Sequence, residues 1–231
     1  MNFRWYALPL VALLAGCSSG GSAIYDTFQY AATAKKDNSV APRLNPSFSY
    51  LRVTVEGRPL FLARGSIDAH PQGPIEVWYS SSREVIRLQN GRIVGSSGTS
   101  IEWREVLIPP MPSWSAIARA KEFTWLRTRD VMPGYRFGVN DRLVLRLIEP
   151  PGNTSLVGIQ AKNLTWFEET IREPQSELPN ESLQSFEALP PARYAVAFSD
   201  GGEQVVYGEQ CLARTFCFTW QRWNSDSPSA N

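Results

Sequence analysis

Residues of the types that commonly carry catalysis are sparse in this chain. His70 is the only histidine among 231 residues, so any mechanism that needs an imidazole depends on it, and Asp68 stands two residues away. A carboxylate so close could orient the ring. No serine lies in a Gly-x-Ser-x-Gly nucleophile elbow, because Gly95-Ser96-Ser97-Gly98 has the wrong spacing. We expect His70 to be a solvated loop residue and the chain to have no catalytic triad.

Metal and glycosidase chemistry gain no better support. A zinc site needs three or four His, Cys or carboxylate ligands, and the residues around His70 do not supply them. Glu168 and Glu169 are the only adjacent carboxylates, but neighbours on a strand face opposite sides and cannot flank one glycosidic bond. We expect no catalytic, metal or cofactor site, and we expect that the protein is not an enzyme.

Cys17 is a candidate for a different kind of chemistry, the covalent attachment of lipid. One basic residue, Arg4, precedes an apolar stretch from Trp5 to Leu14 that is too short for the roughly 20 residues of a membrane-spanning helix. The stretch closes on Leu14-Ala15-Gly16-Cys17, which resembles the lipobox of bacterial lipoproteins. The alternative is an ordinary secretory signal in which Cys17 is incidental. We expect residues 1–16 to be a lipoprotein signal peptide.

The lipobox resemblance also implies an anchor and a compartment. Such lipoproteins carry three acyl chains on the cysteine, and each buried methylene contributes about 0.8 kcal/mol, so the anchor is permanent in practice. Lipoproteins without Asp after the cysteine are as a rule carried to the outer membrane, so Ser18 implies the periplasmic face of that membrane. We expect residues 17–23 to be the lipidated cysteine and a flexible tether, 24–224 a single mainly-β domain, and 225–231 a tail.

The charge balance restricts the partners. Arg4 is the only charged residue in 1–16, so the rest of the chain carries 22 Lys and Arg against 22 Asp and Glu. A formally neutral chain without a basic run argues against nucleic acid and against electrostatic attraction to anionic lipids. We therefore expect the protein to contact the membrane through the acyl chains of its anchor.

Cys211 and Cys217 could form a disulfide in an oxidising compartment. Six residues along one straight strand span about 20 Å, whereas bridged α-carbons lie within about 7 Å. A bridge therefore requires a turn between them, which Gly208 to Arg214 could supply. The sequence leaves this bridge open.

Alternation of apolar and polar residues dominates from Tyr50 onward and predicts strands. The clearest local pattern is a hairpin, Val85 to Gln89 and Arg92 to Val94 around Asn90-Gly91, because Asn-Gly accepts the positive φ angles of a two-residue turn. A short helix is expected within Ile24 to Lys36, and Ile171 to Pro190 is expected to be a loop. Further strands are expected at Leu51–Val55, Leu60–Arg64, Ile75–Ser80, Ile101–Leu107, Glu122–Arg129, Arg142–Ile148, Leu156–Ile159, Leu164–Phe167, Arg193–Phe198, Gln204–Tyr207 and Thr215–Trp223.

The tryptophans allow two interpretations. Exposed indole rings stack on sugars, so a glycan-binding surface is one of them, but aromatic residues also suit strands and fill the core of a wide sheet. Most tryptophans lie in alternating segments, so we expect core positions for them. Trp114, beside Pro112 in a turn, is the expected exception and candidate ligand contact.

Several segments together resemble one known family. Trp78-Tyr79-Ser80 and Val85 to Gly98, with its Leu88-Gln89-Asn90-Gly91-Arg92-Ile93 run, resemble the group 4 capsule polysaccharide lipoprotein family, the GfcB and YjbF type. Val205 to Gly208 and Phe216 to Trp220 look like that family's last hairpin. The resemblance implies a large antiparallel meander curled into a half-barrel or open barrel, in an outer-membrane lipoprotein encoded with polysaccharide secretion genes. The acidic Ile171 to Pro190 segment and the cysteine pair depart from it.

Two functions follow as expectations. The first is a non-enzymatic accessory in capsule or exopolysaccharide assembly or export, with export proteins or the polysaccharide as partners. The second is a periplasmic binding module that holds a glycan or an acyl chain in the concave face of a curved sheet. A concave face filled with apolar side chains would exclude the second.

Overall fold

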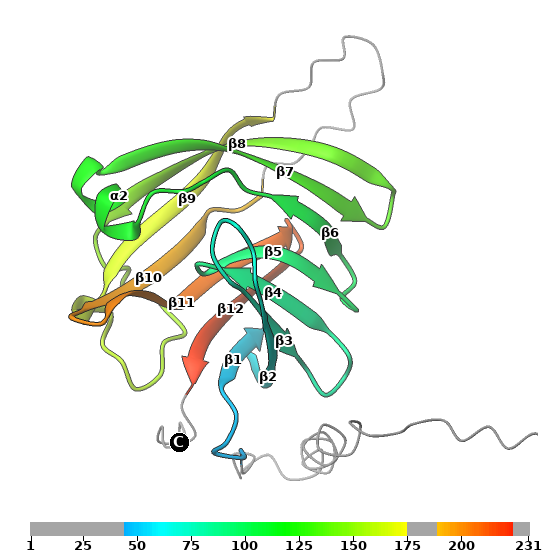
Figure 1. Cartoon of the computed structure of the whole chain (residues 1–231), viewed down its shortest axis with the longest axis horizontal. Coiled ribbons are helices and arrows are strands. Elements are labelled where there is room, and N and C mark those ends of the chain that lie inside the picture. The colour runs from blue at the N-terminus through cyan, green and yellow to red at the C-terminus, as the bar shows by residue number, and fades with distance from the viewer. Residues whose placement is uncertain (1–43, 175–188, 224–231) are drawn as a thin grey trace, which may run out of the picture. The chain divides into compact units, whose positions relative to one another are not determined.

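The computed structural model describes residues 44–174 and 189–223 of the chain, and these form one curved antiparallel sheet (Figure 1). The sheet contains twelve strands and is nearly closed into a barrel, so the expected mainly-β meander is confirmed. The helix expected within Ile24 to Lys36 lies outside the described residues. No described helix has the length and apolar character needed to cross a bilayer.

The strand bounds show that the pattern of alternation located most strands but shortened many of them. The strands are β1 (Tyr50–Val55), β2 (Arg58–Asp68), β3 (Ile75–Tyr79), β4 (Val85–Gln89), β5 (Arg92–Ser97), β6 (Glu102–Leu107), β7 (Glu122–Met132), β8 (Arg136–Ile148), β9 (Thr165–Pro174), β10 (Ala192–Ser199), β11 (Gly202–Ala213) and β12 (Phe216–Trp223).

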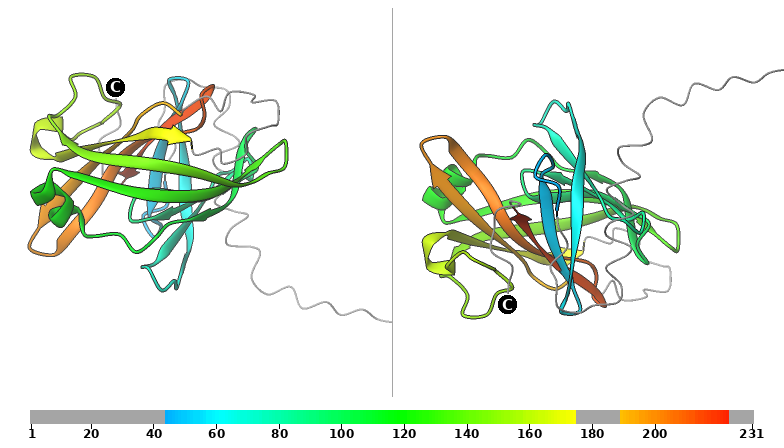
Figure 2. Two further views of the ribbon diagram at one scale, coloured as in Figure 1. Left: turned by 90° about the horizontal axis from the view of Figure 1, so that it is seen from above. Right: turned by 90° about the horizontal axis from the view of Figure 1, so that it is seen from below.

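The strand order explains how the sheet nearly closes. The order is β5-β4-β3-β2-β1-β12-β11-β10-β9-β8-β7-β6, so the first and last strands pair at its centre and two consecutive strands form its edges. Only residues 98–101 connect β5 to β6, which keeps the two edges near each other (Figure 2). The backbone N–H of Trp103 donates to Ser96 Oγ at 2.9 Å across this seam. Such proximity protects edges that would otherwise expose unpaired backbone groups.

The hairpin of β4 and β5 is confirmed around Asn90 and Gly91, whose φ angles are 49° and 81°. The turn also packs tightly, because a Cβ added to Gly91 would lie 2.6 Å from the side-chain atoms of Val205 in β11. Glycine is therefore required at position 91 for two reasons, its positive φ angle and its lack of a side chain.

The helix α2 (Trp114–Ala120) was not expected from the sequence. Ser113 caps it by accepting a hydrogen bond from the Ala116 N–H, and Trp114 and Ile117 are its buried residues. The Glu203 carboxylate accepts hydrogen bonds from the N–H groups of Trp114 and Ser115 at its first turn. These contacts fix α2 over one end of the sheet (Figure 1).

Two sequence-based predictions were wrong, one of a strand and one of where a strand ends. Leu156 to Ile159 is not a strand, because the backbone N–H and C=O of Val157 bond to the side-chain amide of Gln221 instead of to a neighbouring strand. The first residues of the loop expected at Ile171 to Pro190 belong instead to β9, which continues to Pro174 and pairs with β8 as far as Asp141. Residues 175–188 lie outside the described residues.

The core fills the space that the curved sheet encloses. All seven tryptophans of the described residues are buried, with 0 to 7% of their surface exposed: Trp78, Trp103, Trp114, Trp125, Trp166, Trp220 and Trp223. Trp166, Ala195 and Tyr207 form a smaller cluster apart from the main core. The residues between β8 and β9 cover it, because Ser155 N–H donates to the Tyr207 hydroxyl. Burial raises the pKa of Tyr207 to about 12.

Candidate functional site

Charged and polar side chains gather inside the sheet, where apolar residues would be expected. The five neighbouring strands β7 to β11 and the edge strand β5 supply them at positions that face the interior, and we call this set the interior polar cluster. Its members are Arg92 of β5, Arg127 and Arg129 of β7, Asp141 of β8, Glu169 of β9, Tyr194 of β10 and Gln210 of β11. A group of buried ionisable residues is where a functional site is first sought.

Asp141 holds the end of the cluster nearest β7. Its Oδ2 accepts hydrogen bonds from Arg127 Nε at 2.9 Å and from Arg129 Nε at 2.7 Å. Burial alone raises the pKa of Asp141, but the two guanidinium groups outweigh it and hold that pKa below its usual value. Both guanidinium groups also lie over the Trp103 ring, within 5.0 Å of its centre. The Asp141 carboxylate is thus ionised and paired with both arginines.

Arg92 occupies the centre of the cluster and is 3% exposed. Its guanidinium carbon lies 4.1 Å from the centre of the Trp114 ring. Its Nε is 3.8 Å from Glu169 Oε2, which makes an ion pair without a hydrogen bond. Burial lowers the pKa of Arg92 and the charge of Glu169 opposes that shift. Arg92 is therefore held by charge and by aromatic stacking more than by hydrogen bonds.

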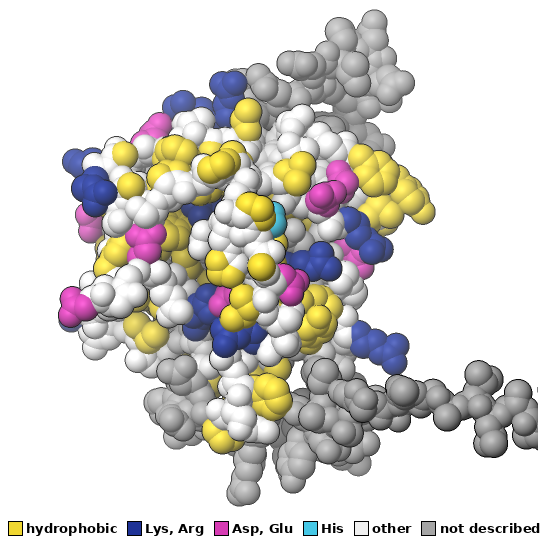
Figure 3. Space-filling model, in the orientation of Figure 1, with side chains coloured by type: hydrophobic (Ala, Val, Ile, Leu, Met, Phe, Trp, Pro, Cys, Tyr) yellow, Lys and Arg dark blue, Asp and Glu magenta, His cyan; other side chains and the backbone are white. Residues whose placement is uncertain are grey.

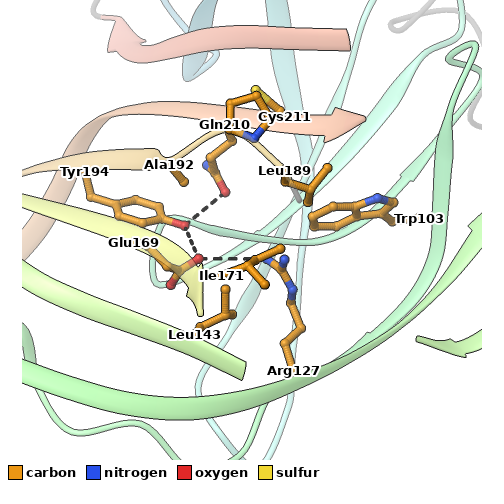
Figure 4. Close-up of a pocket in the computed structure, with 11 residues that line it drawn as sticks. Trp103, Arg127, Leu143, Glu169, Ile171, Leu189, Ala192, Tyr194, Gln210 and Cys211 are labelled. Atoms are coloured by element: carbon orange, nitrogen blue, oxygen red, sulfur yellow. Dashed lines mark hydrogen bonds and ion pairs between the residues drawn. The ribbon is translucent and has the colours of Figure 1, made fainter. Parts of the chain in front are cut away.

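Glu169, Tyr194 and Gln210 point toward one another across the interior (Figure 4). The Tyr194 hydroxyl lies 3.3 Å from Glu169 Oε1 and 3.4 Å from Gln210 Oε1, and its single hydrogen serves one of them at a time. Burial, and next the charge of Glu169, raise the pKa of Tyr194 well above its ordinary value. Tyr194 is therefore a neutral donor at any physiological pH.

Gln210 links this cluster to the β4–β5 hairpin. Its Nε2 donates to the carbonyl of Gly91 at 3.1 Å, and its Oε1 accepts from the Ile93 N–H at 3.1 Å. One side-chain amide thus satisfies both backbone groups that flank Arg92, more than 110 residues away in the sequence. The hairpin is locked against β11 by this contact and by the packing of Gly91 on Val205.

A small cavity lies beside the cluster. Its lining includes Trp103, Arg127, Glu169, Leu189 and Tyr194, and its volume is about 20 Å³. That volume admits about one water molecule, whereas small-molecule sites measure roughly 300–1,000 Å³. This cavity is therefore too small for a glycan or an acyl chain, and the interior around it is occupied largely by buried side chains.

His70 lies apart from this cluster, in the turn between β2 and β3. It is exposed, and its Nδ1 lies within hydrogen-bond distance of the Gln72 N–H and of Gln89 Nε2. Asp68 instead accepts a hydrogen bond from Ser66 Oγ at 3.0 Å. The structure places His70 as a solvated loop residue, as expected, and does not assemble it with a nucleophile.

The two adjacent carboxylates separate as the strand geometry requires. Glu168 pairs with Arg193 at 3.3 Å and remains partly exposed, whereas Glu169 lies inside the sheet. Groups of His, Cys, Asp and Glu that could hold a metal ion do not occur among the described residues.

Two of the three cysteines, Cys211 and Cys217, lie in the part of the chain that the structure describes. Cys211 and Cys217 stand directly opposite each other in β11 and β12 and form a disulfide, with their α-carbons 3.9 Å apart. The turn between them is tighter than expected and consists of Arg214 and Thr215. Cys17, the expected lipidation site, lies outside the described residues.

Trp114 is not the surface residue that the sequence suggested. It is 4% exposed, because it begins α2 and stacks on Arg92, Phe167 and Tyr194. The expectation arose from Pro112 and the assumed turn, and it missed the Ser113 cap that starts a helix. An incoming ligand would have to displace the core to reach this ring.

The interior polar cluster itself was missed from the sequence. One signal for it exists in β7, where Trp125, Arg127, Arg129 and Val131 share one face and both ends of the series are apolar. A pair of arginines between two buried residues on the same face indicates buried ion pairs. The partner carboxylates cannot be identified without the strand register.

Comparison with known proteins gives a fold and little more. No protein-family model matches the chain, and a search of curated proteins finds no match. Among solved structures, the hypothetical lipoprotein YmcC from Escherichia coli K12 is similar, with a TM-score of 0.53. The two proteins share a fold. The match covers 90% of this chain and 100% of YmcC at 15% sequence identity. YmcC is described as a hypothetical lipoprotein, so the group 4 capsule resemblance stays a prediction.

Proposed function

We propose that this protein is a lipoprotein anchored through Cys17 to the periplasmic face of the outer membrane. Three observations support the proposal: the Leu14-Ala15-Gly16-Cys17 sequence, the Ser18 that follows it, and the fold shared with a protein described as a lipoprotein. Mass spectrometry of the N-terminal peptide tests it. The expected result is a modified Cys17 at the N-terminus, and an unmodified Cys17 would contradict the anchor.

The role we propose is a non-enzymatic accessory in capsule or exopolysaccharide assembly or export. The observation that carries it is the position of the Leu88-Gln89-Asn90-Gly91-Arg92-Ile93 run, on which the family resemblance depends. Leu88 and Ile93 are core residues, Gly91 packs on β11, and Arg92 enters the interior polar cluster. The residues that carry the resemblance therefore stabilise a scaffold, which fits a protein that acts through its surface.

Deletion of the gene tests this role. We expect surface polysaccharide to fall in the deletion strain and to return when the intact gene is supplied on a plasmid. The lipidated and mature amounts of other lipoproteins serve as the control, because a general envelope defect would change those as well. Unchanged surface polysaccharide in the deletion strain would contradict the role.

The filled interior leaves little support for a binding module in the concave face. If that face held a glycan, stacking tryptophans would be accessible, but all those described are buried. Iodide quenching of tryptophan fluorescence distinguishes the two cases. The filled interior predicts weak quenching with no protection by added oligosaccharide, and strong quenching that a glycan relieves would revive the binding module.

A further inference from the structure

The hairpin of β7 and β8 presents an apolar tip that the core does not use. Tyr135 and Phe137 are 74% and 66% exposed, the two highest values among the exposed large apolar residues described. Met132, the last residue of β7, and Pro133 of the turn lie next to them in the chain. We define residues 132–137 as the aromatic tip. Exposed apolar residues that gather in one place mark a surface that meets a partner or a membrane.

The tip projects past the end of the β8–β9 ladder, while β6 runs beside β7 as far as the pair of Glu102 and Met132. β7 and β8 are among the longest strands, with 11 and 13 residues, and they continue to pair with each other as far as Val131 and Arg136. The ladder from β8 to β9 stops earlier, at the pair Asp141 and Pro174. In Figure 1 the turn of this hairpin lies at the right edge of the sheet, and Figure 3 shows hydrophobic side chains gathered at that place.

The chemistry of the tip fits a lipid interface. Residues 131–139 contain one arginine, Arg136, and no Asp or Glu, and the Asp130 carboxylate lies at the base of this segment, where it accepts a hydrogen bond from the Gly138 N–H. A contact confined to the interfacial layer leaves Asp130 among the hydrated headgroups. Tyr135 lies in the turn with a φ angle of 53°, and Phe137 is the second residue of β8, so two exposed rings stand two residues apart at this end of the hairpin. Tyrosine is favoured at membrane interfaces because its ring is apolar and its hydroxyl stays in contact with water.

The backbone of the tip suits the same environment. Pairing between β7 and β8 satisfies the groups up to the turn, and the Gly138 N–H donates to Asp130 Oδ1 at 2.8 Å. Few backbone groups would therefore lose hydrogen bonds on entering an apolar layer. A narrow convex tip also suits a deformable lipid surface better than the flat, closely packed area that a stable protein interface needs.

We propose that the aromatic tip inserts into the interfacial layer of a phospholipid bilayer and gives the domain a second, non-covalent membrane contact. The contact goes beyond the proposed role in polysaccharide export and does not depend on it. Where Cys17 is lipidated, the contact gives the domain a second point of attachment, which restricts its orientation relative to the membrane.

Vesicle flotation of the unlipidated chain tests the contact without the anchor. The mature Cys17→Ser chain is mixed with vesicles of phosphatidylethanolamine and phosphatidylglycerol. It is compared with a chain that also carries Tyr135→Ser and Phe137→Ser. We expect the two tip substitutions to lower the vesicle partition coefficient roughly tenfold or more. The matched control carries Ile67→Ser and Leu126→Ser, which remove two apolar side chains that are 54% and 52% exposed elsewhere, and it should float like the parent.

A site-specific probe gives an independent reading. Tyr135→Cys in the Cys17→Ser chain supplies one free thiol, since Cys211 and Cys217 are bridged. An environment-sensitive fluorophore on this thiol should brighten and shift to the blue when vesicles are added, and the same label at Ile67→Cys should not. The proposal is overturned if the parent does not float, if the tip variant floats equally, or if the tip label does not respond. Cross-linking of the tip to an envelope protein without vesicle binding would overturn it in favour of a protein partner.

Discussion

The guanidinium of Arg92 lies over the ring of Trp114, with 4.1 Å between the guanidinium carbon and the ring centre. Arg92 follows the Asn90-Gly91 turn directly, and Trp114 is the first residue of α2. The contact therefore joins a hairpin and a helix inside the sheet. It places a positive charge in a site where water is excluded, so its free energy depends on Glu169 and on the aromatic rings around it.

Replacement of Arg92 should be costly. Arg92→Ala leaves the buried carboxylate of Glu169 with less compensation and opens a cavity against Trp114, so we expect the free energy of unfolding to fall by about 3–5 kcal/mol. Urea denaturation measures it. The matched control is Arg87→Ala, an exposed arginine in the same hairpin, which should change stability by less than about 0.5 kcal/mol. Equal effects of the two substitutions would contradict the role of Arg92.

Gly91 should tolerate no side chain. Gly91→Ala combines a strained φ of 81° with a clash against Val205, so we expect a loss of about 2–4 kcal/mol in the free energy of unfolding. Gly57→Ala is the control, because its φ is 76° but nothing lies within 4 Å of the added Cβ. It should cost only about 1–2 kcal/mol. Val205→Ala removes two of the three Val205 atoms that clash with the added Cβ, so the double variant should lose less stability than the sum of the two single losses. Additive losses would show that the two residues do not interact.

Asp141 should make stability depend on acid pH. Its pKa is lowered in the folded state, so the stability it contributes is present above its unfolded pKa of about 3.9 and is lost as the pH falls through the folded value. Asp141→Asn should therefore unfold at lower urea than the parent at pH 7, and the difference should shrink below about pH 4. The exposed Asp68→Asn is the control. A difference that stays constant with pH would show that ionisation of Asp141 is not the cause.

The cysteines of the last hairpin should not react as thiols. In purified, non-reduced protein we expect no labelling of Cys211 or Cys217 by a thiol reagent, even after denaturation, and two labelled thiols after reduction. The bridge closes a short loop, so its loss should lower the free energy of unfolding by only about 2 kcal/mol. Two reactive thiols without reduction would show that the bridge does not form.

The strands and the central hairpin were predictable because their causes are local. Alternation between Leu51 and Val55, or the Asn90-Gly91 pair, specifies a conformation without reference to the rest of the chain. α2 was missed because it has only seven residues. Its buried face consists of two of them, Trp114 and Ile117, which is too few to form a recognisable helical pattern. The error at Leu156 to Ile159 has a non-local cause, since Gln221 in the last strand takes the hydrogen bonds of Val157.

The partners of the arginines in the interior polar cluster were not predictable for the same reason. An arginine in an alternating strand is normally taken to face water, and only the nearly closed sheet brings Glu169 to within 3.8 Å of Arg92. Trp114 illustrates the reverse error, because the turn expected near it suggested exposure and the helix buries it. Register and closure, which a single sequence does not specify, decide which polar residues enter the core.

The distribution of polysaccharide between the cell surface and the periplasm tests the central claim most directly. It is measured in the deletion strain, in that strain with the wild-type gene, and in that strain with Cys17→Ser. An anchored export accessory predicts that polymer shifts from the surface to the periplasm in the deletion strain, that the wild-type gene reverses the shift, and that Cys17→Ser does not. The same distribution in all three strains would contradict the claim.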